Sequence, residues 1–193
     1  VVNRITMLLL GTKGLLDVGR KALDQQPDRI TLVPGKAPIK PEARSALSAL
    51  ERRGFERAGS FEVREMKGVL LHLLVKTMES AVAVVYEHTK AGVWADLSTR
   101  YADGSSYTIT SSRIGGGLDD RPGHKMVRSP GQPPAMLAVR LMKDRPSGQM
   151  QQISAAEFAR VFEQAYAEST AWRKGKGLTA EEVRRAGSER ISA

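Results

Sequence analysis

Residues 68–112, GVLLHLLVKTMESAVAVVYEHTKAGVWADLSTRYADGSSYTITSS, decide the fold. Within them, Val, Leu, Ile, Tyr and Thr gather in runs at 68–76, 81–88, 92–102 and 106–112, and such residues favour extended strands. The connections between these runs are short, which is typical of antiparallel neighbours. The dipeptide Asp103–Gly104 indicates a tight hairpin turn, because glycine readily adopts the positive φ that such a turn needs.

A further run, FERAGSFEV at 55–63, precedes them, and its Gly59 predicts a kink in the strand. We therefore predict an antiparallel meander of four to five strands over about residues 55–113. Alternation gives this sheet an apolar face that we expect the helices to cover, built from Val69, Leu71, Val93, Leu97 and Ile109.

Helical periodicity flanks the predicted meander on both sides. Ser154 and Glu157 form a capping box at the start of the strongest segment, and Thr179 and Glu182 repeat the box in a segment with little apolar surface. The predicted helices are 4–24, 41–53, 134–144, 154–177 and 179–190. The fold class is therefore α+β, with N- and C-terminal helices covering the sheet.

Prolines and glycines divide the chain into three parts. We expect residues 1–40 to be an N-terminal helix and a Pro-rich linker that form an arm, with a short strand at 29–33. Residues 41–177 form a single α+β domain, and 178–193 form a peripheral helix or tail. Because the sequence begins at Val1, we expect a longer parent protein, with a membrane anchor upstream as a hypothesis.

The composition limits the classes of function. The chain has 193 residues and no cysteine, which excludes disulfides, Cys-ligated zinc, iron–sulfur clusters and thiol nucleophiles. Its net charge of +9 would attract nucleic acid or anionic membranes. No window approaches the roughly 18–20 uninterrupted apolar residues of a membrane span.

The segment 114–134 reads as a long loop, and long loops are often functional. Its Asp119, Asp120 and His124 are candidate acid–base or metal-binding groups, although their spacing matches no metal motif and we assign no metal site. Three glycines at 115–117 do not make a phosphate cradle, because prolines prevent a helix from following directly. We expect no nucleotide or other cofactor.

Two more groups of residues are candidates for binding. On the strand at 92–102, Trp94 shares the outer face with Arg100, and a four-residue turn before the strand would place Glu87 opposite Trp94. We expect this face, together with Arg121, to bind a partner or ligand. The most basic stretch would contact polyanions; it contains Arg173, Lys174, Lys176, Arg184 and Arg185.

These observations lead to one principal interpretation and two alternatives. The principal one is a non-catalytic soluble module that binds a ligand, another protein or an upstream segment of its own chain, through the outer sheet face and the 114–134 loop. The first alternative is a metal-assisted hydrolase that uses Asp119, Asp120 and His124. The second is a basic domain that binds nucleic acid or an anionic membrane.

Overall fold

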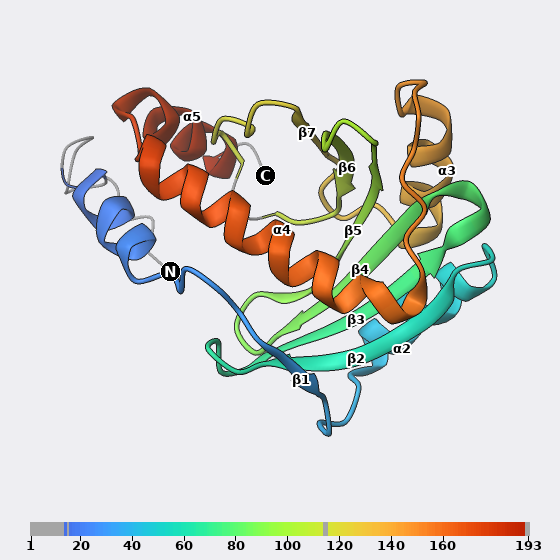
Figure 1. The fold of residues 1–193 in the computed structure, drawn as a ribbon. Helices are drawn as coiled ribbons and strands as arrows, with labels where there is room; N and C mark the ends of the chain where they lie inside the picture. The colour runs from blue at the N-terminus through green and yellow to red at the C-terminus, as the bar shows by residue number, and fades with distance from the viewer. Residues whose placement is uncertain (1–13, 15, 114–115, 192–193) are drawn as a thin grey trace.

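The computed structural model describes residues 14, 16–113 and 116–191, with backbone only for 187–191. Its centre is one sheet of seven strands that follow one another in chain order (Figure 1). The strands are β1 (Leu32–Pro34), β2 (Glu56–Val63), β3 (Val69–Lys76), β4 (Ala81–His88), β5 (Gly92–Arg100), β6 (Ser106–Thr110) and β7 (His124–Arg128). The α+β class and the antiparallel meander over β2 to β6 are confirmed, but the sheet has more strands than predicted.

The hairpin between β4 and β5 turns through residues 89–91, one fewer than expected. His88 pairs with Gly92, whose φ of 83° lies in the region that glycine tolerates best. Tyr86 therefore lies opposite Trp94, and the predicted pairing of Glu87 with Trp94 is wrong. Side chains alternate between the two faces of a strand. A loop that is one residue shorter therefore shifts every cross-strand pair by one position and changes which side chains share a face.

Strand β7 lies in the segment that was predicted to be a loop. It pairs with β6 in parallel, so Ser106 lies opposite His124 and Tyr107 opposite Lys125. A parallel pair needs a connection of a dozen or more residues, and the glycine-rich stretch after Thr110 provides it. The prediction of a continuous loop over 114–134 is therefore wrong at its centre.

Helix α4 (Ala155–Lys176) crosses one face of the sheet (Figure 1). It begins with the predicted capping box of Ser154 and Glu157. Beneath it lie odd-numbered side chains of β3 and even-numbered side chains of β4, packed around Phe158. These sheet residues are Leu71, Leu73, Val75, Val82 and Val84.

Helices α2 (Pro41–Glu51) and α3 (Pro134–Asp144) cover the opposite face, close to their predicted bounds. They pack on Leu97 and Ile109, together with the partly buried Val93. The predicted apolar face therefore mixed two faces: Val69 and Leu71 lie under α4, whereas Val93, Leu97 and Ile109 lie under α2 and α3. Both faces are covered, so the sheet carries apolar side chains on both sides.

A buried network of hydrogen bonds joins the start of α2 to the sheet. The Ser60 hydroxyl lies 2.8 Å from His72 Nδ1, and His72 Nε2 lies 2.7 Å from Glu87 Oε1. The other carboxylate oxygen of Glu87 accepts the backbone N–H of Lys40, which precedes the first turn of α2. Each buried polar group of this network therefore has a partner.

The predicted arm also contacts the sheet. Residues 16–24 are helical, whereas residues 4–13 and 15 of the predicted helix lie outside the described residues. Ile30 is buried beneath α4, and β1 pairs antiparallel with β2. The division at residues 40 and 178 stays a prediction. Among the described helices, none has both the length and the apolar character that crossing a membrane requires.

Candidate functional site

A cavity of about 290 Å³ lies between α4 and strands β4 to β7, and we call it the inner cavity. Its walls differ in chemistry, because most apolar side chains come from β4 and α4, and most polar ones from β5, β6, the segment around β7 and the later part of α4. The apolar wall contains Val82, Val84, Phe158, Val161, Phe162 and Ala165. The polar wall includes Asp96, Arg100, Arg121, His124 and Glu168.

Asp96 is the most perturbed carboxyl group of this wall. Burial raises its pKa to about 6, against the opposing effects of the Thr110 and Tyr86 hydroxyls and the Arg128 charge. Its Oδ1 is closed off from solvent and accepts no hydrogen bond from the described residues. A buried acceptor without a partner is costly, which makes Asp96 a candidate for binding a group that can donate to it.

Tyr86 supports Asp96 from the neighbouring strand. Burial and the adjacent Asp96 charge raise the pKa of the Tyr86 phenol well above its usual value, so the hydroxyl stays protonated. The Tyr86 ring stacks on Trp94, with 4.7 Å between centroids, and it also contacts Phe162 of α4 at 6.4 Å. Trp94 is therefore half-buried and holds Tyr86 against the cavity wall.

Arg100 lines the same cavity on the same face of β5. Its Nε is closed off from solvent and donates to none of the described residues. Arg121, by contrast, forms an ion pair of 3.1 Å with Glu168 of α4. That bond and a second from Gln164 hold the pKa of Glu168 below its usual value. Arg121 thus has a carboxylate partner, whereas Arg100 forms no ion pair among the described residues and interacts with the Glu168 charge only beyond ion-pair distance.

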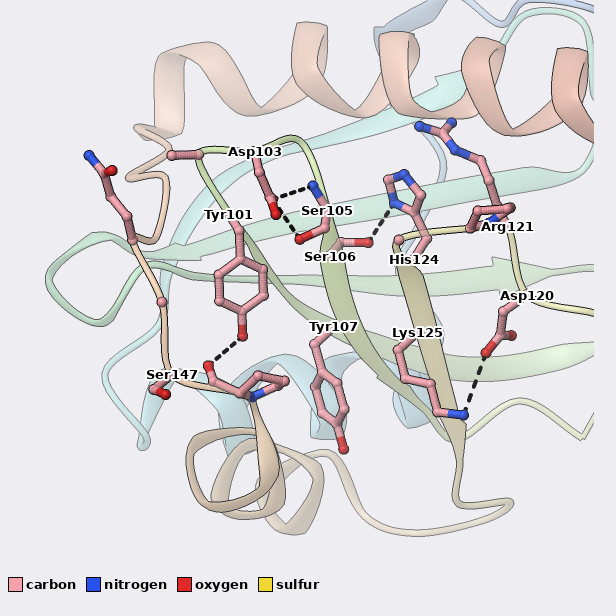
Figure 2. A pocket seen from close by; sticks show the side chains of 16 residues that line it. Tyr101, Asp103, Ser105, Ser106, Tyr107, Asp120, Arg121, His124, Lys125 and Ser147 are labelled. Carbon is pink, nitrogen blue, oxygen red and sulfur yellow. Dashed lines mark hydrogen bonds and ion pairs between the residues drawn. The ribbon is translucent and has the colours of Figure 1, made fainter.

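A second, open depression of about 780 Å³ adjoins the inner cavity, and we call it the outer groove (Figure 2). It includes Tyr101, Asp103, Tyr107 and Asp120, and it shares with the inner cavity Ser106, Arg121, His124 and Lys125. In Figure 2 the side chains of Arg121 and His124 point toward the long helix, whereas Tyr107 and Lys125 point to the other side of the sheet. The shared residues therefore form the wall between the two hollows.

His124 occupies this wall at the start of β7. Its Nδ1 lies 2.9 Å from the Ser106 hydroxyl, its partner across the strands. Burial, followed by the nearby charges of Arg121 and Arg100, lowers the pKa of His124. The imidazole is therefore neutral at neutral pH.

The structure places Asp119, Asp120 and His124 in three different environments. Asp119 forms ion pairs with Lys176, at 3.0 Å, and with Arg185. Asp120 accepts the backbone N–H of Met126, at the edge of β7. His124 bonds to Ser106, as described above. Among the described residues, no group of three or more His, Asp or Glu side chains could hold a metal ion.

The basic residues near the C-terminus hold the end of the chain together. Helix α5 (Ala180–Ile191) carries Glu182, which accepts hydrogen bonds from Arg173 at 2.7 Å and from the backbone N–H of Asp119 at 2.9 Å. Gly117 allows this approach, since a Cβ there would lie 2.2 Å from the backbone nitrogen of Ala186. Lys174 pairs with Asp28. Most of the predicted polyanion contacts are therefore engaged in ion pairs; Arg184 also has an interaction within the protein.

Sequence reasoning selected Trp94, Arg100, Arg121 and His124, which the structure places in or beside the inner cavity. It passed over Asp96, although alternation places Asp96 on the same face as Arg100. The sequence did contain a signal for Asp96, because polar residues occupy alternate positions of this strand at Asp96, Ser98 and Arg100. The sequence contained no signal for Glu168 and Phe162, because they reach the inner cavity only where α4 crosses the sheet.

Comparisons of the chain with protein-family models, with curated proteins and with solved structures found no match.

Proposed function

We propose that this protein binds a small molecule in the inner cavity and acts as a binding module. The observation that carries the proposal is the pair of Asp96 and Arg100 on one face of β5. Each lines the cavity, and each has a buried polar atom without a partner among the described residues. Buried polar atoms in folded proteins are nearly always paired, so these two favour a ligand that pairs them.

The dimensions of the cavity support a small ligand. Its volume of about 290 Å³ lies just below the range of roughly 300–1,000 Å³ that is typical of small-molecule sites, which favours a small ligand. Apolar walls with a few convergent polar groups are also typical of such sites. The outer sheet face was the predicted binding surface, and α4 covers it, so the space there fits a small molecule better than a protein partner.

Stability gives a second argument for the proposal. An ionised carboxylate at Asp96 is unfavourable in the folded protein, as its raised pKa indicates. Perturbed carboxyl groups that line a cavity cluster at binding and catalytic sites, so Asp96 supports a binding role for the inner cavity. No comparable observation favours the metal-assisted hydrolase or the polyanion-binding domain, which stay predictions.

A cavity-filling variant tests the proposal. Ala165 of α4 lines the inner cavity, and Ala165→Phe would occupy it, whereas Ala171→Phe adds the same ring to an exposed position of the same helix. Calorimetric titration would use six-carbon probes that differ in their polar groups: hexanoate, hexan-1-ol, 6-hydroxyhexanoate and 6-aminohexanoate. We expect at least one probe to bind the wild type and Ala171→Phe but not Ala165→Phe. Equal binding by all three proteins, or by none, would reject the proposal.

A further inference from the structure

The two ends of the inner cavity differ in charge. At one end Arg100 and Arg121 face Glu168, and His124 beside them is neutral at neutral pH, so this end carries a net positive charge. Arg121 already has its carboxylate partner in Glu168, whereas Arg100 has none among the described residues. A guanidinium in this position is best satisfied by a carboxylate, because its planar donors match the two carboxylate oxygens.

The other end presents an acceptor. Asp96 is surrounded by Tyr86 of β4, Thr110 of β6 and Arg128 of β7. From α4, the titratable groups that line the cavity are Tyr166 and Glu168, and from the remaining walls they are Arg100, Arg121, His124 and Lys125. No group in this set donates to Asp96 Oδ1. A ligand group that donates a hydrogen bond would therefore find its acceptor here.

Asp96 and Arg100 lie four positions apart on β5, which places their Cα atoms about 13 Å apart. Between them, the Ser98 hydroxyl is paired with the Thr108 hydroxyl at 2.7 Å and needs no further partner. Val82 and Val84 lie beside Ser98 and Asp96 as their partners on β4, and Phe158 of α4 lines the same cavity, so the surroundings here are apolar. The middle of the cavity thus suits a hydrocarbon chain, because it offers no unsatisfied polar group.

We infer that the ligand is a short-chain carboxylic acid with a hydrogen-bond donor, a hydroxyl or an ammonium group, several carbons away from the carboxylate. The carboxylate binds Arg100, the donor binds Asp96 Oδ1, and the chain lies against the apolar wall. This inference rests on the proposed function and specifies the class of ligand.

Calorimetric titration of the full chain at pH 7.5 with the six-carbon probes tests the inference. We expect 6-hydroxyhexanoate or 6-aminohexanoate to bind at least ten-fold more tightly than both hexanoate and hexan-1-ol, because each charge-assisted bond contributes separately. Arg100→Met keeps the aliphatic stem and should abolish the advantage of the carboxylate. Asp96→Val keeps the shape of the side chain and should abolish the advantage of the donor.

The pH dependence distinguishes the two donors. An ammonium group needs the ionised form of Asp96, so binding of 6-aminohexanoate should weaken several-fold as the pH falls through about 6. A hydroxyl group has less need of the charge, and 6-hydroxyhexanoate should show the smaller change. The inference is supported if 6-aminohexanoate binds more tightly and shows the strong pH dependence. It is also supported if 6-hydroxyhexanoate binds more tightly and shows the weak pH dependence.

The outcomes separate the inference from the proposed function. If hexanoate or hexan-1-ol binds as tightly as the two-ended probes, and Ala165→Phe abolishes that binding, the inference is wrong and the proposed function stands. If a two-ended probe is preferred but Arg100→Met and Asp96→Val bind it unchanged, the inference is likewise wrong. If no probe binds, or if binding survives in Ala165→Phe, both are rejected.

Discussion

The buried carboxylate of Glu182 accepts the backbone N–H of Asp119 at 2.9 Å, across a sequence separation of 63 residues. Arg173 and Lys176 pair with the same carboxylate at 2.7 and 2.9 Å. Burial opposes ionisation, but these bonds and the N–H of Thr179 hold the pKa of Glu182 well below its usual range. One side chain thus joins α4, α5 and the segment that leads to Arg121.

Replacing this carboxylate should destabilise the C-terminal region. Glu182→Gln leaves Arg173 without its carboxylate partner and Lys176 with Asp119 alone, and breaking a buried ion pair of this kind costs about 3–5 kcal/mol. We expect urea unfolding to show a loss approaching that size and hydrogen exchange to increase in α5. Glu181→Gln changes an exposed neighbour and should cost less than about 1 kcal/mol. Equal effects of the two variants would contradict the buried role of Glu182.

The contribution of Glu182 should depend on pH in a defined direction. Its folded pKa is depressed, so its stabilisation is fully present above the unfolded value of about 4.3 and declines as the pH falls below it. Urea midpoints of the wild type and Glu182→Gln should therefore differ most at pH 6–7, and the difference should shrink steadily as the pH falls from about 4 toward the depressed folded pKa. A difference that grows on acidification would contradict this sign.

Asp96 should show the opposite dependence. Its folded pKa is raised to about 6, so the folded state binds the proton more tightly than the unfolded state does. Ionisation of Asp96 therefore lowers the free energy of unfolding. This loss is absent below the unfolded pKa of about 3.9, grows as the pH rises, and reaches about 3 kcal/mol above the folded pKa of about 6. We expect Asp96→Asn to be more stable than the wild type at pH 8 and equal to it near pH 4.

Asp103 offers the matched control for this titration. Hydrogen bonds from the Ser105 hydroxyl and the Ser105 N–H lower the pKa of Asp103, which is an exposed turn residue. Asp103→Asn should therefore lose stability relative to the wild type at neutral pH, and the loss should disappear in acid. If Asp96→Asn behaves like Asp103→Asn, the buried position of Asp96 is contradicted.

The stacked rings of Tyr86 and Trp94 should be energetically coupled. They lie opposite each other on β4 and β5, with an interplanar angle of 6°. A double-mutant cycle of Tyr86→Leu and Trp94→Leu should give a coupling energy of about 0.5–1.5 kcal/mol in urea unfolding. Glu87 and Trp94, which lie on opposite faces, supply the control cycle, and a larger coupling for that pair would contradict the observed register.

The His72–Glu87 pair should show the cost of an unpaired buried group. Glu87→Leu leaves His72 Nε2 and the Lys40 N–H without their acceptor, and we expect a loss of roughly 2–4 kcal/mol. The double variant His72→Leu/Glu87→Leu removes both ends of the buried bond, so it should cost less than the sum of the single variants. Additive losses in urea unfolding would show that the two side chains do not interact.

Local patterns were enough to predict several elements from the sequence alone. The bounds of α3 and α4, the capping box at Ser154 and the turn at Asp103–Gly104 agree with the structure. Helix ends and tight turns depend on residues within a few positions of one another, so their patterns lie in a short stretch of chain. Alternation also placed Trp94 and Arg100 correctly on one face of a strand.

Tertiary structure alone decided the register, the last strand and the cavity. The side chains of a strand repeat every two residues, so one residue in the turn before Gly92 determined which partners face each other. Strand β7 is too short and polar to be recognised without its neighbour β6. Asp96 and Glu168 are 72 positions apart and line one cavity only because α4 crosses the sheet. The sequence determined the elements and their faces, and long-range packing decided which polar groups meet.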